Sequence, residues 1–244
     1  MRIVCCGEAL IDFKATGPLA FQGYVGGSPL NVAVAASRLG AEVGFISQLS
    51  SDMFGDAIRR AMTDNGIDMS LVLQSDAPST LAFVSELDGD VHFSFLSNGA
   101  ADTLYDPQPR PQLPASVRLV EFGSISLLFE PTASSIIDIV AAHQDRCTVV
   151  FDPNVRPALI HDKDAYLVQL PRWLSLSHLV KVSTQDLKWL YPGQDPVQAA
   201  AEWLTHGPQA VIVTQGRQGA SLLRANKPTL TVPCLLYTSD AADE

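Results

Sequence analysis

The feature of this sequence that most constrains its fold is a repeated alternation of short β-branched or apolar runs with longer segments of helical period. Such an alternation predicts βαβ units and a mainly parallel sheet, because parallel strands need a crossover connection that is usually a helix. Strands are predicted at residues 2–6, 42–48, 117–122, 147–151, 179–182 and 210–214. Helices are predicted at residues 30–39, 55–65, 131–143, 163–174, 184–190 and 196–206. We therefore expect a layered, Rossmann-like α/β core.

One region breaks this alternation. Residues 71–73, 80–87 and 90–96 are strand-like runs without helices between them, and Asp88-Gly89 is a typical hairpin turn. With a strand-like piece at residues 21–25, they predict a small antiparallel sheet that lies as a flap over the mouth of the main sheet. An ordinary hairpin at the edge of the main sheet is the alternative. Pro107, Pro109, Pro111 and Pro114 predict an extended link back into the core.

Composition excludes several classes of protein. Of 244 residues, 47% are apolar and 17% are charged, so the chain can bury a core. The formal charge of −10 leaves no basic surface for a nucleic acid. No apolar run approaches the roughly 18 residues of a membrane span, and Glu8 interrupts the N-terminal run too early for a signal peptide. We therefore expect a cytoplasmic protein whose four cysteines, which form no CxxC pair, are reduced thiols.

The first candidate site lies at the start of the first predicted helix. Gly26 and Gly27 would let a ligand approach the backbone closely, and the helix start offers free N–H groups and the Asn31 side chain. Asp12 follows the first strand, at the end where open α/β sheets bind ligands, and could accept hydrogen bonds from a polyol. A mere helix-entry turn, and a turn or cap role for Asp12, are the alternatives.

Polar residues also follow two later strands. Asp152, Asn154 and Arg156 stand in a proline-stiffened turn, where they can bind hydroxyl groups and phosphate; a simple turn with an Asn cap is the alternative. Ser183 and Asp186 stand at the next helix start, where capping alone would explain both residues.

A Gly-x-x-Gly segment follows the last predicted strand. Gly216 and Gly219 would permit a tight turn whose backbone can lie against a nucleotide, with the Thr214 hydroxyl beside it. A plain β-turn between two strands explains these residues nearly as well.

In this order, and with the flap between the first two α/β units, these segments resemble the ribokinase-like (PfkB) carbohydrate kinases, and most closely their fructokinase branch. The resemblance covers residues 4–232. It is carried by Gly26-Gly27-Ser28-Pro29-Leu30-Asn31-Val32-Ala33, by residues 39–43 continuing to Asp52-Met53-Phe54-Gly55, by Ala101-Asp102, by residues 151–156 and by Val182-Ser183. It implies a ribokinase-like, three-layer kinase domain at residues 1–234, with flap (lid) strands within about 12–25 and 71–96.

The resemblance also implies an activity, which is transfer of a phosphoryl group from ATP, with Mg²⁺, to a sugar hydroxyl, in first place that of fructose. It assigns the sugar site to Asp12, Gly26, Gly27, Asn31, Phe93, Phe95, Asp152, Asn154 and Arg156, of which the last three line the region of phosphoryl transfer. It assigns the nucleotide site to Lys181, Ser183, Thr214, Gly216 and Gly219, and the metal contact to Asp186.

The sequence departs from the family pattern before the Ala101-Asp102 pair. Many relatives carry an arginine there, whereas this chain reads Ser97-Asn98-Gly99-Ala100. This difference disfavours an acidic sugar and favours a neutral one. Kinases for ribose, 2-keto-3-deoxygluconate or a nucleoside are the alternative activities, because the choice of sugar depends on flap geometry and a few hydroxyl contacts.

A larger departure lies at the C-terminus. Family members continue through a Gly-Ala-Gly-Asp segment, whose amides form an anion hole and whose Asp is the catalytic base, and this sequence contains no such segment. Residues 237–244 can be laid on it with Asp243 at the base position, but Asp240 and Ala242 would replace both glycines. We therefore expect a C-terminally truncated chain that is inactive by itself, with an unassigned base and a non-native tail at residues 235–244.

Two further functional alternatives follow from the sequence. A sugar-binding pseudokinase would keep Asp12, Gly27 and Asn31 without turnover. A nicotinamide-dependent oxidoreductase is disfavoured, because no GxGxxG motif follows the first strand. The expected ligands are a small sugar and ATP, and an exposed flap edge could pair across a two-fold axis to form a homodimer.

Overall fold

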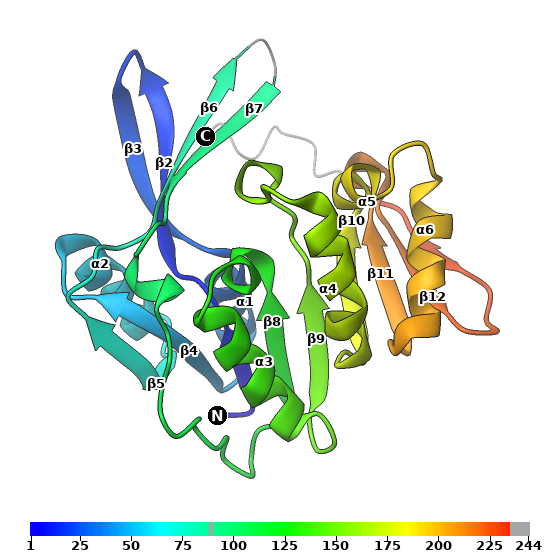
Figure 1. The fold of residues 1–244 in the computed structure, drawn as a ribbon, viewed down its shortest axis with the longest axis horizontal. Coiled ribbons are helices and arrows are strands. Elements are labelled where there is room, and N and C mark those ends of the chain that lie inside the picture. The colour runs from blue at the N-terminus through cyan, green and yellow to red at the C-terminus, as the bar shows by residue number, and fades with distance from the viewer. Residues whose placement is uncertain (88–89, 235–244) are drawn as a thin grey trace.

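The computed structural model describes residues 1–87 and 90–234 and contains two sheets (Figure 1). The strands of the main sheet are β1 (Ile3–Cys6), β4 (Val43–Ser50), β5 (Asp68–Ser75), β8 (Leu119–Gly123), β9 (Thr148–Asp152), β10 (Leu179–Ser183), β11 (Ala210–Thr214), β12 (Ala220–Arg224) and β13 (Leu230–Val232). Their order is β13-β12-β11-β10-β9-β8-β1-β4-β5. The sheet is parallel from β11 to β5 and antiparallel at β12 and β13. The predicted mainly parallel core is confirmed.

Helices cover both faces of one half of this sheet. They are α1 (Ser28–Arg38), α2 (Met53–Asp64), α3 (Thr132–His143), α4 (Lys163–Ser175), α5 (Thr184–Leu190) and α6 (Pro196–Glu202). The helices α3 to α6 pack on one face, against alternate strand residues such as Phe122, Phe151 and Val182. On the other face, α1 and α2 pack on Cys5 and Phe45. Burial of apolar strand residues on both faces is what a parallel sheet requires.

The face that carries α1 and α2 is open over the other half of the sheet. In β10 and β11 the residues on the opposite face are buried, whereas Leu179 and Ile212 on this face are only half-buried. Val150 of β9 and Leu222 of β12 show the same pattern. No helix among residues 1–87 and 90–234 covers these side chains.

The second sheet forms a lid that stands above the core (Figure 1). Its strands are β2 (Leu10–Gly17), β3 (Ala20–Gly26), β6 (Leu81–Leu87) and β7 (Asp90–Leu96), in the order β3-β2-β6-β7. Both outer pairs are antiparallel, while β2 and β6 in the middle are parallel. The predicted flap is therefore a separate sheet, and the alternative of an edge hairpin on the main sheet is wrong. The predicted Asp88-Gly89 turn lies outside the described residues.

Two expectations about the lid need correction. Residues 71–73 belong to β5 of the main sheet, where Leu71 pairs with Ile46 of β4, and not to the lid. A short apolar run does not reveal which sheet it joins, because that depends on its partner strand. Asp12 is not a turn residue after the first strand but lies inside β2, opposite Tyr24 of β3.

Aromatic side chains attach the lid to the core. The ring of Phe13 in β2 stacks on Phe83 of β6 at 5.1 Å, and Phe54 of α2 meets Phe13 edge to face at 5.7 Å. We call the face of the lid that carries Phe13 and Phe83 its outer face. Because side chains alternate across a strand, Asp12 and Lys14 lie on the other face of β2, above the main sheet.

Candidate functional site

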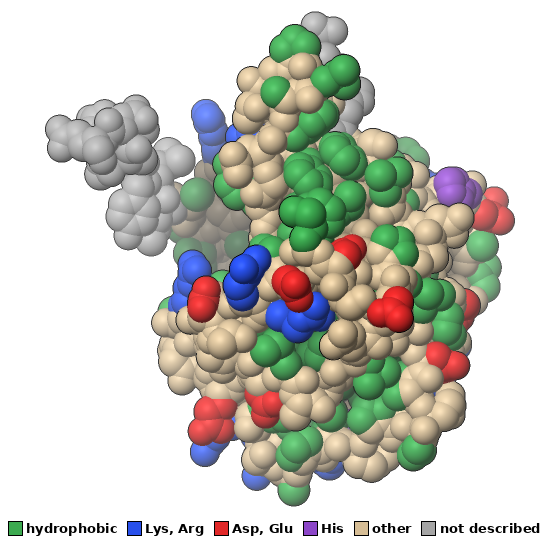
Figure 2. Space-filling view, turned by 90° about the vertical axis from the view of Figure 1, so that its left-hand side faces the viewer, with side chains coloured by type: hydrophobic (Ala, Val, Ile, Leu, Met, Phe, Trp, Pro, Cys, Tyr) green, Lys and Arg blue, Asp and Glu red, His purple; other side chains and the backbone are tan. Residues whose placement is uncertain are grey.

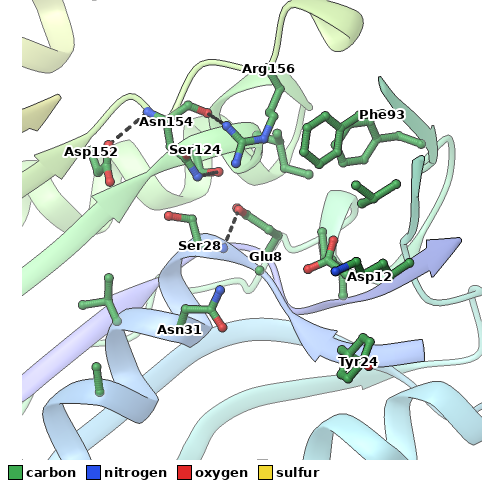
Figure 3. Close-up of a pocket in the computed structure, with 18 of the residues that line it drawn as sticks. Glu8, Asp12, Tyr24, Ser28, Asn31, Phe93, Ser124, Asp152, Asn154 and Arg156 are labelled. Carbon is green, nitrogen blue, oxygen red and sulfur yellow. Dashed lines mark hydrogen bonds between the residues drawn. The ribbon is translucent and has the colours of Figure 1, made fainter. Parts of the chain in front are cut away.

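A cavity of about 730 Å³ lies between the lid and the carboxyl ends of β1, β8 and β9 (Figure 3). The lid lines it with Leu10, Asp12, Lys14, Tyr24, Val84, Phe93 and Phe95. The core lines it with Glu8, Gly27, Ser28, Asn31, Val32, Ala35, Ser124, Ile125, Asp152, Asn154, Arg156 and Lys181. A polar floor thus faces a roof with aromatic rings, and such a cavity suits a small molecule rich in hydroxyl groups.

Asp12 has room for its carboxylate because Gly26, two residues beyond its partner Tyr24 in β3, has no side chain. A Cβ atom on Gly26 would lie 2.1 Å from Asp12 Oδ2, so only glycine leaves room for the carboxylate. Gly26 itself does not line the cavity. Burial raises the pKa of Asp12, and the positive charge of Arg156 opposes that rise. Asp12 is thus a carboxylate of reduced hydration that can accept hydrogen bonds from a ligand.

The start of α1 forms one part of the floor. Gly27 has a φ of 109°, and a Cβ atom there would lie 2.6 Å from the carbonyl oxygen of Glu8. The Ser28 N–H donates to Glu8 Oε1 at 3.2 Å. Asn31 lies one turn further along the helix and faces the cavity (Figure 3).

The turn after β9 forms the opposite wall. Asp152 forms an ion pair with Lys181, in which Nζ lies 3.0 Å from Oδ2. Burial raises the pKa of Asp152, and Lys181 opposes that rise. Asn154 Nδ2 donates to Ser124 Oγ at 3.2 Å. Three segments of the chain therefore hold the polar side chains of this wall.

Arg156 connects the wall to the lid. Its Nη1 donates to the carbonyl oxygens of Asn154 and Val155 at 3.4 and 3.1 Å. The guanidinium carbon lies 5.4 Å from the centre of the Phe93 ring, within the range of a cation–π contact. The position of the lid strand β7 is therefore coupled to the turn that carries Asp152 and Asn154.

Asp186 has a structural role that the predicted metal contact did not include. Its carboxylate accepts from the N–H and the hydroxyl of Ser183, at 3.0 and 2.6 Å, and from the N–H of Val155 at 3.0 Å. The alternative of a capping box is confirmed. Within the described part of the chain no group of three or more His, Cys, Asp or Glu side chains could hold a metal ion. A direct metal bond would compete with these three hydrogen bonds, so the residues present do not form a metal cage.

A second cavity, of about 670 Å³, begins two residues further along β10 from Lys181. It brings together four of the predicted nucleotide residues, Ser183, Thr214, Gly216 and Gly219. A Cβ atom on Gly219 would lie 2.0 Å from the carbonyl oxygen of Val232, so only glycine at position 219 allows the turn to lie this close to β13. Lys181 lines the first cavity instead, at its border with the second.

The sequence interpretation missed several residues of the first cavity. In the sequence, Glu8 was noted only as a charged residue that interrupts an apolar run. That interruption was the signal that could have indicated a buried functional carboxylate. If the hairpin of β2 and β3 had been predicted, Lys14 would have followed from Asp12 because residues two apart share a face, and Tyr24 would have followed because it pairs with Asp12. Ser28 and Ser124 carry no local signal. The predictions for residues 235–244, including Asp243, lie outside the described residues.

Comparison with known proteins identifies the family of this chain. The model of the pfkB family carbohydrate kinases matches residues 1–239. This chain belongs to the PfkB family of carbohydrate kinases. It is 34% identical over 226 residues to a fructokinase of Rhizobium leguminosarum bv. trifolii, across 90% of this chain and 68% of that protein. It is 33% identical to fructokinase-1 of Zea mays, across 89% of this chain and 71% of that protein.

Solved structures of PfkB kinases have the same fold. The fructokinase from Xylella fastidiosa superposes with a TM-score of 0.85 at 30% identity, over 97% of this chain and 76% of that one. The same fructokinase is also known with bound ATP. The aminoimidazole riboside kinase from Salmonella enterica, complexed with aminoimidazole riboside and an ATP analogue, superposes with a TM-score of 0.84 at 25% identity, over 96% and 77% of the two chains. The predicted ribokinase-like fold and the fructokinase branch are confirmed.

No helix among the described residues is long and apolar enough to cross a membrane. Three of the four cysteines, Cys5, Cys6 and Cys147, are buried, and all four are free thiols.

Proposed function

We propose that this PfkB kinase phosphorylates fructose with ATP. The observation that carries the proposal is that the two cavities follow one another along β10, where Lys181 lines the first, with the predicted sugar residues, and Ser183 lines the second. Phosphoryl transfer depends mainly on positioning and on electrostatic stabilisation of the transferred group, and adjoining sites for sugar and nucleotide meet that need.

The sugar occupies the first cavity in this proposal. Asp12 and Asn31 bind its hydroxyl groups from two sides, and Asn154 and Asp152 lie towards the nucleotide. Phe93 and Phe95, whose rings stack at 6.0 Å, cover an apolar face of the sugar ring. The curated relatives named fructokinases support fructose as the sugar.

The nucleotide occupies the second cavity. The backbone of the turn at Gly216 and Gly219 borders it, and Thr214 and Ser183 offer hydroxyl groups. Mg²⁺ would be supplied with the nucleotide phosphates and would neutralise their charge, and Asp186 would contact it only through water, because its carboxylate is already hydrogen-bonded.

The experiment is calorimetry with fructose, together with a coupled assay of ADP release. Fructose binding with fructose-dependent ADP release supports the proposal. Binding without turnover agrees with the expectation that a chain without the Gly-Ala-Gly-Asp segment is inactive by itself, as a sugar-binding pseudokinase would be, and absence of fructose binding refutes the fructose assignment.

A nucleoside kinase is the second candidate. The structural likeness to aminoimidazole riboside kinase favours it, as do the aromatic rings of Phe93, Phe95 and Tyr24 in the roof, since rings of this kind can stack on a base. Tighter binding of a nucleoside than of fructose or ribose in the same calorimetry would select this candidate.

We also propose that two copies pair through their lids. The edge strands β3 and β7 and the turn before β3 expose Leu19, Tyr24 and Leu96, and hydrophobic side chains gather on the face that carries the lid and α2 (Figure 2). Exposed strand edges and apolar patches are typical of such interfaces. Sedimentation equilibrium tests the pairing: Leu96→Lys is expected to lower the mass to that of one chain, and a wild-type monomer would refute it.

A further inference from the structure

Glu8 is a buried carboxylate at the junction of three segments that form the cavity floor (Figure 3). Its side chain is only 2% exposed and lies directly after β1. Oε1 accepts from the N–H of Ser28, at the start of α1, at 3.2 Å. Oε2 accepts from the N–H of Ser126 at 3.3 Å and from its hydroxyl group, in the turn after β8.

The bond to Ser28 substitutes for a missing helix cap. Gly27 occupies the N-cap position and has no side chain that could accept from the first turn. Glycine is required at this position because its φ is 109° and a Cβ atom would collide with Glu8. The side chain of Glu8 therefore provides the acceptor that the first turn of the helix lacks. Burial raises the pKa of Glu8, and hydrogen bonds from Ser124, Ser126 and Ser28 oppose that rise.

The bonds to Ser126 extend the same link to the opposite wall. Ser126 belongs to the turn that begins at Ser124, and Ser124 accepts the hydrogen bond from Asn154. The Glu8 N–H in turn donates to Ser126 Oγ at 3.1 Å, so residues 8 and 126 are bonded in both directions. A single side chain thus links the segment of Asn31 to the segment that orients Asn154.

We propose that Glu8 is a positioning residue for the sugar site, which sets the distance between the start of α1 and the Ser124–Ser126 turn. This inference rests on the proposed sugar kinase function. Both carboxylate oxygens are engaged with the protein, so Glu8 acts on the sugar through Asn31 and Asn154 and does not bind it directly.

A carboxylate is needed here because each of its oxygens faces a backbone N–H, which can only donate. The N–H of Ser28 faces Oε1 and the N–H of Ser126 faces Oε2, whereas the Ser126 hydroxyl, which also lies 3.1 Å from the carbonyl oxygen of Gly123, can donate or accept. In Glu8→Gln one oxygen becomes an NH₂ group, which would face a donor and lose at least one hydrogen bond to a charged acceptor. The two segments would then separate although the size of the side chain is unchanged.

The test compares Glu8→Gln with Glu121→Gln. Glu121 is a matched control because it is a glutamate of the same sheet, is 3% exposed and does not line the cavity. Burial, followed by the negative charges of Asp152 and Glu8, raises its pKa to about 8, so glutamine in its place removes less negative charge at pH 7 than it would from an ordinary glutamate. We expect Glu8→Gln to weaken fructose binding about tenfold or more and to leave ATP binding within about twofold. Glu121→Gln should leave both affinities within about twofold.

Amide hydrogen exchange gives a readout that does not depend on the sugar. In Glu8→Gln the Ser28 and Ser126 amides should exchange about tenfold faster than in the wild type, and in Glu121→Gln they should not. Unchanged exchange at both amides, or equal losses of fructose and ATP affinity, would overturn the proposal. If the wild type binds no fructose, the proposed function fails, while the exchange rates still decide the role of Glu8.

A milder variant serves if Glu8→Gln does not fold. Ser126→Ala removes the hydroxyl that donates to the carboxylate and accepts from the Glu8 N–H, and it leaves the carboxylate in place, so fructose affinity should fall about two- to tenfold as these two hydrogen bonds are lost. An unchanged fructose affinity in Ser126→Ala would then overturn the proposal.

Discussion

Substitution of Gly26 by alanine tests whether the carboxylate of Asp12 binds the sugar. The new Cβ atom would lie 2.1 Å from Asp12 Oδ2, whereas ordinary contacts begin at 3.4 Å, so the oxygen must move by about 1.3 Å. A hydrogen bond of normal length, about 2.8 Å, would then exceed the limit at which it contributes. The loss of a hydrogen bond to a charged group costs about 1.5–3 kcal/mol. Fructose affinity should therefore fall roughly 10- to 150-fold.

The assay is calorimetry with fructose on Gly26→Ala and on a matched control, Gly17→Ala. Gly17 lies in the same hairpin, and a Cβ atom there would make an ordinary contact of 3.7 Å with Ala20. Neither glycine has a positive φ, so neither substitution strains the backbone. Both variants should melt within a few degrees of the wild type, and only Gly26→Ala should lose affinity. Fructose affinity within about twofold of the wild type in Gly26→Ala would refute the role of Asp12.

Three further predictions follow from the contacts of the site and the core. Phe93→Leu removes the ring under Arg156, a contact worth about 0.5–2 kcal/mol, so fructose affinity should fall roughly 2- to 30-fold, whereas Phe21→Leu on the outer face of the lid should change it little. Lys181→Met removes the positive charge beside Asp152, so the pKa of Asp152 should rise in an NMR titration, and an unchanged pKa would contradict the ion pair. Burial raises the pKa of Asp102 to about 7 and that of Glu121 to about 8. The native state therefore holds more protons than the unfolded chain between about pH 4 and 8, so stability should fall as pH rises from 5 to 8 in thermal melts. Glu121→Gln should reduce this dependence, and a wild type more stable at pH 8 than at pH 5 would contradict it.

Most helices and parallel strands could be predicted because their signals are local. The helix at residues 184–190 and the strand at residues 210–214 agree with α5 and β11 in both bounds. Both have a regular burial pattern, which hydrophobic periodicity reproduces. The strand β2 was not predicted with its bounds although its sequence offers the signal, because Ile11, Phe13 and Ala15 alternate with Asp12, Lys14 and Thr16 as in a half-buried strand.

The sequence by itself determined the order of the elements and the chemical groups at the ends of the strands. Asp152 and Asn154 could be proposed for a site at one edge of the sheet because parallel strands present their carboxyl ends there, whereas the grouping of Asp12 and Asn31 with them followed from the family resemblance. Gly26 and Gly27 could be proposed as the point of close approach because glycine has few other reasons to occur in pairs before a helix.

Only the tertiary structure decided which groups meet. Glu8 contacts residues 20 and 118 positions away, and Asp186 contacts a residue 31 positions away, so no local pattern could show that both carboxylates are occupied by protein donors. Arg156 meets the lid only because β7 lies above the turn after β9. The physical reason is that burial and strand order, which the whole chain sets together, determine whether a polar side chain finds its partner in the protein or is left for a ligand.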